Sequence, residues 1–254
     1  DPEYVDAYNK SGLAKYYLQD YKGAIEDYTK AIKVDPEYAF SYYNLGIVKI
    51  FLNHFKSKGN KILDFGAGIG TLSILYEKMS GVKPFCVEID LENRKSLKSK
   101  GFIVFKSIFD SKKNFDAVFS SNVLEHIEND QETLNNIYKK LNNDGLLFLF
   151  LPAFQILYSD MDKKVGHFRR YSKQDIKKKI KKAKFKIVYF SYLDSLGFFA
   201  SFVMKIIGYN EKKGIGSPKS LEFYDKYIIP VSFFLDKIGL KFFFGKNLIL
   251  LAKK

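Results

Sequence analysis

Short apolar runs alternate with amphipathic stretches along most of the chain. Residues 62–65 form the first run, residues 66–70 follow as a glycine-rich turn, and residues 71–80 continue with helical periodicity. Further strand-like runs lie at 84–90, 102–106, 146–151, 185–192 and 247–252, another strand with its loop is expected within 114–127, and helices are predicted at 131–141 and 173–182. The run at 146–151 is apolar throughout, which indicates a central strand buried on both faces. We therefore expect an α/β fold around a mainly parallel sheet.

About fifty residues rich in Phe, Tyr, Leu and Ile separate the last two predicted strands. Within them, residues 196–207 and 227–240 are expected to form apolar helices, and residues 211–219 a polar loop. A segment this apolar has to be covered by the core, by a second subunit or by a membrane surface. We favour a lid over a substrate pocket that suits a lipid-linked or otherwise hydrophobic substrate. A role in the core alone is the alternative.

The first 52 residues form a separate unit. Two segments repeat with an offset of 34 residues, so that Gly12 matches Gly46 and the string Asp-Pro-Glu-Tyr at 1–4 recurs at 35–38. The period and the small and aromatic positions resemble the tetratricopeptide repeat. This resemblance implies antiparallel helices that bind a partner protein, or that serve only as a spacer. The helix beginning at Ala39 has no stop signal, and we expect it to continue into the unit behind it.

The net charge of +14 is unevenly distributed. Residues 1–52 carry six Lys against eight Asp and Glu, so residues 53–254 carry +16. This difference supports a boundary near residue 52. The basic part can face nucleic acid, anionic lipid or a phosphorylated substrate, unless the lysines reflect only a coding bias.

Cysteine content and the length of apolar runs bear on location. The single Cys86 excludes an internal disulfide and fits a reducing compartment, so a cytoplasmic protein is expected. No stretch of about 18 uncharged apolar residues occurs, so no spanning helix is expected. Peripheral contact with a membrane is compatible with this pattern. The sequence begins with Asp1 rather than Met, which indicates a fragment or a processed chain.

The glycine-rich turn carries the first chemical signal. A strand, a glycine turn and a helix together present backbone N–H groups and a positive helix end to a ligand. The spacing differs from the dinucleotide fingerprint G-x-G-x-x-G, because Thr71 stands where its last glycine belongs. The string instead resembles motif I of the class I S-adenosylmethionine (SAM) methyltransferases, through matches at Asp64, Gly66, Gly68 and Gly70.

This resemblance implies a Rossmann-like fold over residues 53–254, with a doubly wound, mostly parallel sheet of seven strands. It places Asp64, Gly66, Ala67, Gly68 and Gly70 at the methionine and ribose part of SAM. It also makes the apolar segment at about 195–243 an insertion, because the last two strands of such domains are joined by a short link. A purely structural turn between strand and helix is the alternative.

Further cofactor contacts are expected at the ends of the next strands. Glu88 follows the second strand, and the resemblance makes it the acceptor of hydrogen bonds from both ribose hydroxyls, with Asp90 as the second choice. It adds Ile89, Ser107 and Asn122 to the cofactor-binding residues. Many relatives carry an Asp after the third strand for the adenine amine. This chain lacks it, so backbone groups near Ser107 are expected to make that contact.

The string from Phe115 to Ile127 resembles F-D-x-V followed by x-x-x-V-L-x-H-I, which marks the fourth strand and its loop in many small-molecule methyltransferases. Enzymes that methylate base or amide nitrogens usually carry an N/D-P-P-Y type tetrapeptide at this place. Its absence argues against base N-methylation. His126 is interpreted as a packing histidine near SAM rather than as a base.

A second polar cluster follows the fifth strand. Residues 166–172 resemble the string G-H-x-R-R-Y-[ST] of a subgroup of these enzymes. We predict that His167 takes a proton from an acceptor hydroxyl, that Arg169 and Arg170 clamp a carboxylate or phosphate, and that Tyr171 orients either group. The alternative is that the arginines pair with acids such as Asp160 or Asp162 and hold the loop closed.

The sequence therefore predicts a SAM-dependent methyltransferase, with O-methylation of a small-molecule, sugar or lipid-linked acceptor as the first hypothesis. A nucleic-acid methyltransferase, supported only by charge, is one alternative. A non-catalytic repeat protein that binds SAM or a partner is the other. No metal is expected, because His54, His126 and His167 lie in separate segments without ligand spacing.

Overall fold

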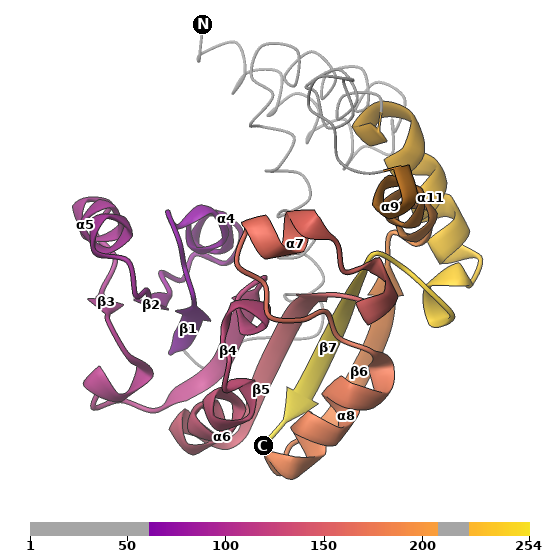
Figure 1. The fold of residues 1–254 in the computed structure, drawn as a ribbon. Coiled ribbons are helices and arrows are strands. Elements are labelled where there is room, and N and C mark those ends of the chain that lie inside the picture. The colour runs from indigo at the N-terminus through magenta and orange to yellow at the C-terminus, as the bar shows by residue number, and fades with distance from the viewer. Residues whose placement is uncertain (1–60, 208–223) are drawn as a thin grey trace, which may run out of the picture.

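A computed structural model describes residues 61–207 and 224–254 of the chain. In them a seven-stranded sheet has the order β3-β2-β1-β4-β5-β7-β6 (Figure 1). The strands are β1 (Ile62–Phe65), β2 (Phe85–Val87), β3 (Val104–Phe105), β4 (Phe115–Ser121), β5 (Leu141–Pro152), β6 (Lys186–Leu193) and β7 (Asn247–Lys253). β7 runs antiparallel to both of its neighbours, and the other neighbouring strands pair in parallel. The predicted doubly wound, mostly parallel sheet is confirmed.

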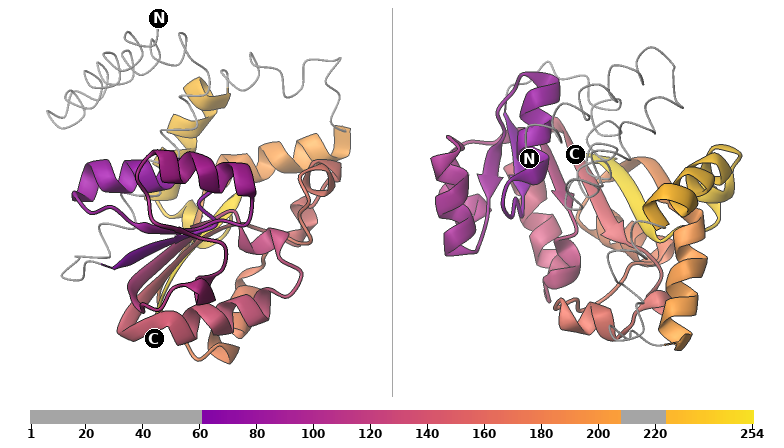
Figure 2. Two further views of the ribbon diagram at one scale, coloured as in Figure 1. Left: turned by 90° about the vertical axis from the view of Figure 1, so that its left-hand side faces the viewer. Right: turned by 90° about the horizontal axis from the view of Figure 1, so that it is seen from above.

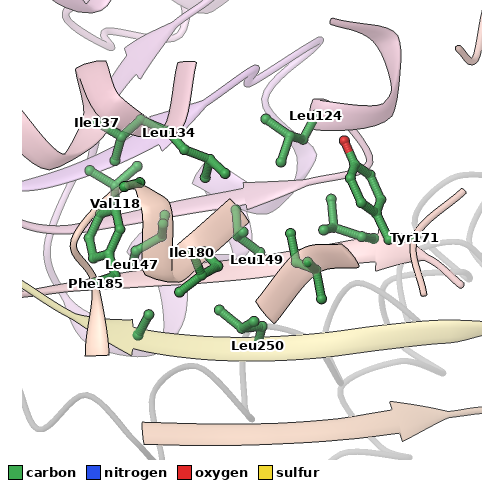
Figure 3. Close-up of a cluster of buried hydrophobic side chains, with 14 of the residues drawn as sticks. Val118, Leu124, Leu134, Ile137, Leu147, Leu149, Tyr171, Ile180, Phe185 and Leu250 are labelled. Carbon is green, nitrogen blue, oxygen red and sulfur yellow. The ribbon is translucent and has the colours of Figure 1, made fainter. Parts of the chain in front are cut away.

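Four longer helices cover the two faces of the sheet, as Figure 2 shows from two further directions. They are α4 (Thr71–Ser80), α5 (Leu91–Ser99), α6 (Asp130–Lys140) and α8 (Lys173–Lys182). On one face, buried residues of α6 and α8 such as Leu134 and Ile180 pack with strand residues such as Val118 and Leu147 (Figure 3). On the other face α4 contributes Tyr76 and α5 contributes Leu97.

Strand β5 is the central strand that its sequence indicates. Leu147, Leu149 and Leu151 belong to the core under α6 and α8, whereas Phe148 and Phe150 belong to the core under α4. Successive side chains of a strand point to opposite faces, so an unbroken apolar run is buried on both. The expectation for residues 146–151 is confirmed.

The short elements that matter for function follow the carboxyl ends of the parallel strands. They are η1 (Ile108–Asp110) after β3, η2 (Leu124–His126) after β4, and η3 (Gln155–Leu157) with α7 (Asp160–Lys164) after β5. Ligands of open α/β sheets bind at this edge. The long loop after β5 is closed at its base, because the Tyr171 N–H donates to Pro152 O at 2.9 Å and the Phe154 N–H donates to Tyr171 O at 2.9 Å.

Several boundaries differ from the predicted ones. The second strand covers only Phe85–Val87, inside the predicted 84–90, and the third covers only Val104–Phe105, inside the predicted 102–106. Residues 142–145, expected as a turn, belong to an irregular start of β5, where the register shifts between Phe115 and Ala117. The Asn142 side-chain amide donates to Asp116 Oδ1 at 2.7 Å, which holds the irregular segment against β4.

The apolar segment between β6 and β7 contains α9 (Ser195–Ile207), the π-helical turn η5 (Tyr224–Ile228), α11 (Ile229–Lys237) and η6 (Leu240–Phe242). Apolar helices were expected at 196–207 and 227–240. α9 confirms the first, and α11, which directly follows η5, lies inside the second range. The second helix ends earlier than expected, because Gly239 with φ of 119° separates α11 from η6. No helix among the described residues is long and apolar enough to cross a membrane.

Two buried carboxylates join the helices of this segment. Asp236 of α11 accepts the N–H of Asp194 at 2.8 Å and the hydroxyl of Ser195. Asp194 in turn accepts hydrogen bonds from Ser232 at 2.9 Å and from Tyr224 at 2.5 Å. The helices α9 and α11 are therefore fixed to one another and to the end of β6. The predicted repeat unit at 1–52, its boundary, the long helix from Ala39 and the loop at 211–219 lie outside the described residues.

Candidate functional site

The loop after β1 has the shape of a ligand cradle. Gly66, Gly68 and Gly70 all have positive φ, at 83°, 54° and 92°. A Cβ on Gly66 would lie 2.3 Å from the Val123 side chain, so packing requires glycine there. A Cβ on Gly68 would meet no atom within 4 Å among the described residues. Gly68 therefore faces open space at the carboxyl edge of the sheet, where a ligand can approach its backbone.

Glu88 lies directly against this cradle. Its Oε2 accepts the N–H of Gly68 at 2.6 Å, and its Oε1 accepts the N–H of Asp90 at 2.8 Å. Ile89 projects beside it with 79% of its surface exposed, which provides an apolar face next to the acid. Asp90 caps α5 by accepting the N–H of Asn93 at 2.8 Å. Glu88, rather than Asp90, is thus the carboxylate that borders the glycine loop.

Asp64 lies beneath the loop. Its carboxylate is buried and accepts a hydrogen bond from the Ser73 hydroxyl at 2.7 Å, which links β1 to the first turn of α4. Burial raises the pKa of Asp64 to about 7, with the Ser73 hydrogen bond acting against this shift and the charge of Glu88 adding to it. The geometry gives Asp64 a role in fixing the loop, and its contact with SAM stays a prediction.

Ser107 and Asn122 lie after β3 and β4, at the same edge of the sheet. The Ser107 N–H donates to Asp110 Oδ2 at 2.9 Å, so Asp110 closes a capping box and is engaged within η1. Asn122 is exposed and has a φ of 51°, with its N–H donating to Phe150 O at 2.9 Å. The contacts of both residues with the cofactor stay a prediction.

A second polar cluster lies in the loops after β4 and β5. His167 Nδ1 lies 2.8 Å from Asp162 Oδ1, and its Nε2 lies 3.9 Å from Glu125 Oε1. The rings of His126 and His167 meet edge to face, with centroids 4.5 Å apart. The two histidines were not predicted to meet, and Glu125 was not predicted as a site residue. In the sequence Glu125 is marked only by its position next to His126.

Glu125 is the unusual member of the cluster. Its side chain is fully buried, and neither of its carboxylate oxygens has a hydrogen-bond partner among the described residues. Burial raises the pKa of Glu125 to about 8, although the charge of Arg170 acts in the opposite direction. Desolvation and the neighbouring His167 lower the pKa of His126, so that its imidazole is neutral at pH 7.

The arginines and Tyr171 are engaged by carboxylates of the chain itself. Arg170 Nε donates to Asp162 at 2.8 Å, and Arg169 pairs with Asp130 at 2.8 Å. The buried Tyr171 hydroxyl also donates to Asp130, at 2.9 Å. This is the loop-closing arrangement given above as the alternative, although Arg169 uses Asp130, and Asp160 pairs with Lys163 instead. A substrate clamp formed by these side chains stays a prediction.

The comparisons with known proteins agree with this geometry. A family model described as a methyltransferase domain matches residues 37–189, and a tetratricopeptide repeat model matches residues 12–49. The chain therefore belongs to this family of methyltransferase domains. It is a SAM-dependent methyltransferase, and the predicted cofactor and enzyme class are confirmed. A search of curated proteins found no match to the sequence.

Solved structures show the same fold. A SAM-dependent methyltransferase from Archaeoglobus fulgidus aligns with a TM-score of 0.57 and 18% identity, over 84% of this chain and 94% of that chain. The phosphoethanolamine N-methyltransferase 2 of Haemonchus contortus aligns with a TM-score of 0.54 and 17% identity, over 84% of this chain and 52% of that chain. A cyclopropane synthase from Mycobacterium tuberculosis aligns with a TM-score of 0.54 and 14% identity, over 83% and 84%.

The residues of the cradle fit SAM. The open space at Gly68 admits a ligand against the backbone, Glu88 offers a carboxylate for the ribose hydroxyls, and Ile89 offers an apolar face for the adenine ring. When bound, SAM supplies a methyl group activated by its sulfonium, and transfer to a nucleophile breaks the C–S bond with the electron pair left on sulfur. The chain itself has to bind the acceptor and take up its proton.

Proposed function

We propose that this methyltransferase acts on a hydroxyl oxygen of a lipid-linked or otherwise hydrophobic acceptor. The carrying observation is the segment between β6 and β7, which exposes large apolar side chains next to the loop of His167. On α9 and α11 and just after them the exposed side chains are Phe199, Phe202, Val203, Ile206, Val231, Phe234, Ile238, Phe242 and Phe243. Isolated apolar residues are normal on a surface, whereas a group on adjacent elements favours an apolar ligand or a lipid surface.

The segment is connected to the candidate acceptor site. Lys205 of α9 donates to Ile156 O of η3 at 2.7 Å, and Phe198 packs edge to face on Phe154 with ring centroids 5.0 Å apart. In the same loop the Tyr158 hydroxyl donates to His167 O at 2.6 Å. An acceptor whose apolar part lies along α9 and α11 would thus carry its polar end towards His167.

His167 supports transfer to oxygen. Asp162 fixes the Nδ1–H of the imidazole, which leaves the lone pair at Nε2 to meet the acceptor hydroxyl and receive its proton. Asp162 is held in turn by Arg170 Nε at 2.8 Å and by the Ser159 N–H at 2.9 Å. N-methyltransferases are among the structural neighbours, so transfer to nitrogen stays an outcome of the test.

Basic residues favour attachment to an anionic membrane surface. Lys205, Lys237 and Lys241 flank the exposed apolar side chains on α9, α11 and η6, and the whole chain carries +14. Apolar insertion and attraction to anionic headgroups add in such surfaces. We therefore extend the proposal to a peripheral membrane position, with the repeat-like unit at 1–52 available for a protein partner.

Transfer of labelled methyl from SAM tests the proposal. Lipid extract, a panel of water-soluble phenols and sugars, and RNA serve as acceptors, and we expect alkali-stable label in the lipid phase. Label confined to RNA, or to amines, would overturn the assignment. In flotation with vesicles, Phe234→Ser and Phe243→Ser should release the protein from phosphatidylglycerol, whereas the matched variant Phe109→Ser, remote and 52% exposed, should not. Equal binding by all three variants would argue against a membrane position.

A further inference from the structure

The cluster of Glu125, His126 and His167 forms a set of potential metal ligands that was not predicted from the sequence. The three residues each offer one ligand atom, and these atoms lie within 4.8 Å of one another. Two imidazole nitrogens and one carboxylate oxygen are a common ligand set for zinc and related first-row divalent ions. The absence of ligand spacing in the sequence therefore does not exclude a metal, because the fold brings the two histidines together.

We propose that Glu125, His126 and His167 bind a divalent transition-metal ion, with Zn²⁺ as the first choice. Protein ligands bind Zn²⁺ at about 2.0–2.2 Å, so the donor atoms need to close by roughly 1 Å around the ion. His126 is exposed and Glu125 is buried, so the ion would enter from the solvent side and keep open positions there.

The state of Glu125 supports this assignment. A buried carboxyl group normally has hydrogen-bond partners, because burying a polar group without a partner is costly. Both oxygens of Glu125 lack one among the described residues, and the side chain has no exposed surface. Arg170 influences this carboxylate through its charge, but its Nε–H donates to Asp162, and its buried Nη1 has no hydrogen-bond partner among the described residues. A cation between the carboxylate and the two imidazoles would satisfy the unpartnered oxygens.

Asp162 has the position of an outer-shell partner. Histidines that bind a metal usually donate their second N–H to a carboxylate, which fixes the ring and its tautomer. Here Asp162 Oδ1 lies 2.8 Å from His167 Nδ1, and the capping box at Ser159 together with Arg170 holds the carboxylate in place. With Nδ1 held by Asp162, Nε2 of His167 lies 3.9 Å from Glu125 Oε1, a separation that a shared ion can bridge.

A bound ion would change how the acceptor hydroxyl is activated. A divalent cation lowers the pKa of an oxygen bound to it, so the hydroxyl would lose its proton to solvent and His167 would serve as a ligand instead of receiving the proton. This role rests on the proposed O-methyl transfer, whereas binding of the ion does not. Ion binding and methyl transfer are therefore measured separately.

Titration of the full chain with Zn²⁺ by calorimetry, and with Co²⁺ by absorption, tests the site. We expect one ion per chain and a Co²⁺ spectrum typical of imidazole ligation. Glu125→Gln and His126→Ala should each weaken binding at least tenfold. Asp162→Asn should weaken it by about 10- to 100-fold as an outer-shell change. Glu128→Gln, the same substitution on an exposed side chain three residues away, should bind as the wild type does.

The two proposals fail in different ways. No binding of either ion, or equal binding by wild type and Glu125→Gln, overturns the metal site. If methyl transfer to lipid hydroxyls then still depends on His167, the imidazole receives the proton directly. Stoichiometric ion binding without any transfer to oxygen leaves the metal site intact and overturns the proposed acceptor.

Discussion

The backbone N–H of Gly68 donates to the carboxylate of Glu88 across 2.6 Å, although 20 residues separate the two. The contact joins the turn after β1 to the end of β2, and it orients both groups at the carboxyl edge of the sheet. Parallel strands make this meeting a consequence of topology, because neighbouring strands end side by side. The cofactor cradle is therefore built from backbone and one acid rather than from a set of side chains.

Gly68→Ala tests whether a ligand approaches the Gly68 backbone, without preventing the protein from folding. The new methyl group meets no atom of the described residues within 4 Å, so the protein should fold with only the cost of a left-handed alanine, roughly 1–2 kcal/mol. The methyl would occupy the ligand's space, and we expect SAM affinity in calorimetry to fall at least tenfold. Gly81→Ala is the matched control, because Gly81 has φ of 72° and equally open surroundings at the end of α4. Equal affinities of the two variants would contradict the cradle.

Glu88→Gln should weaken SAM binding by about tenfold or more, since a hydrogen bond to a charged group contributes about 1.5–3 kcal/mol. The amide oxygen can still accept the Gly68 N–H, whereas the Asp90 N–H loses its acceptor, because the amide NH2 group only donates. Glu92→Gln makes the same change on an exposed side chain that pairs with Lys95, and it should bind SAM normally. Unchanged affinity of Glu88→Gln would remove Glu88 from the cofactor site.

Asp64 should make the folded protein less stable as the pH rises. Burial raises its pKa to about 7 from an ordinary value of 3.8, so between these values the folded state holds a proton that the unfolded state has released. The contribution of Asp64 to the free energy of unfolding should therefore fall as the pH rises from about 4 to about 7. Glu125, whose pKa is raised to about 8, adds a slope of the same sign, so Asp64→Asn should reduce the slope in urea titrations without abolishing it. Asp144→Asn, on an exposed residue, should keep the full slope, and equal slopes in the two variants would contradict the assignment.

The contribution of Asp130 to the free energy of unfolding should have the opposite pH dependence. Burial alone would raise its pKa, but Lys179, Arg169 and Tyr171 donate to it and the net pKa is lowered. Its contribution is thus present above about pH 4 and lost as the pH falls further. At neutral pH, Asp130→Asn should cost about 3 kcal/mol, because it breaks a largely buried ion pair. Asp160→Asn, which breaks the exposed pair with Lys163, should cost less than about 1 kcal/mol. Similar losses in both variants would contradict this ranking.

The fold could be predicted because each strand carries its own pattern. The run at 146–151 is buried on both faces as its sequence indicates, and the glycine turn with Glu88 appears where motif and spacing place it. The predicted boundaries of strands were less accurate where tertiary contacts determine where a strand begins or ends. The start of β5 follows from the bond between Asn142 and Asp116, and no local pattern contains that bond.

The second polar cluster could not be predicted from the sequence. Glu125 and His167 are separated along the chain by the whole of α6 and β5, and they meet only because the loop after β5 folds back. Tyr171 secures that return through its backbone bonds to Pro152 and Phe154 and its hydroxyl bond to Asp130. The string of residues 166–172 indicated a polar site, but whether its arginines face a substrate or the chain's own acids depends on Asp130 and Asp162.

The position of β7 constrains how the protein is made. β7 lies between β5 and β6, yet it follows β6 and the apolar helices along the chain. A nascent chain that has emerged only as far as Leu193 still lacks β7. Without β7, β6 has no neighbouring strand and one edge of β5 is unpaired. These strand edges would stay unpaired while more than fifty further residues are translated. Because the apolar helices precede β7 in the chain, we expect the nascent protein to need chaperone protection during this interval.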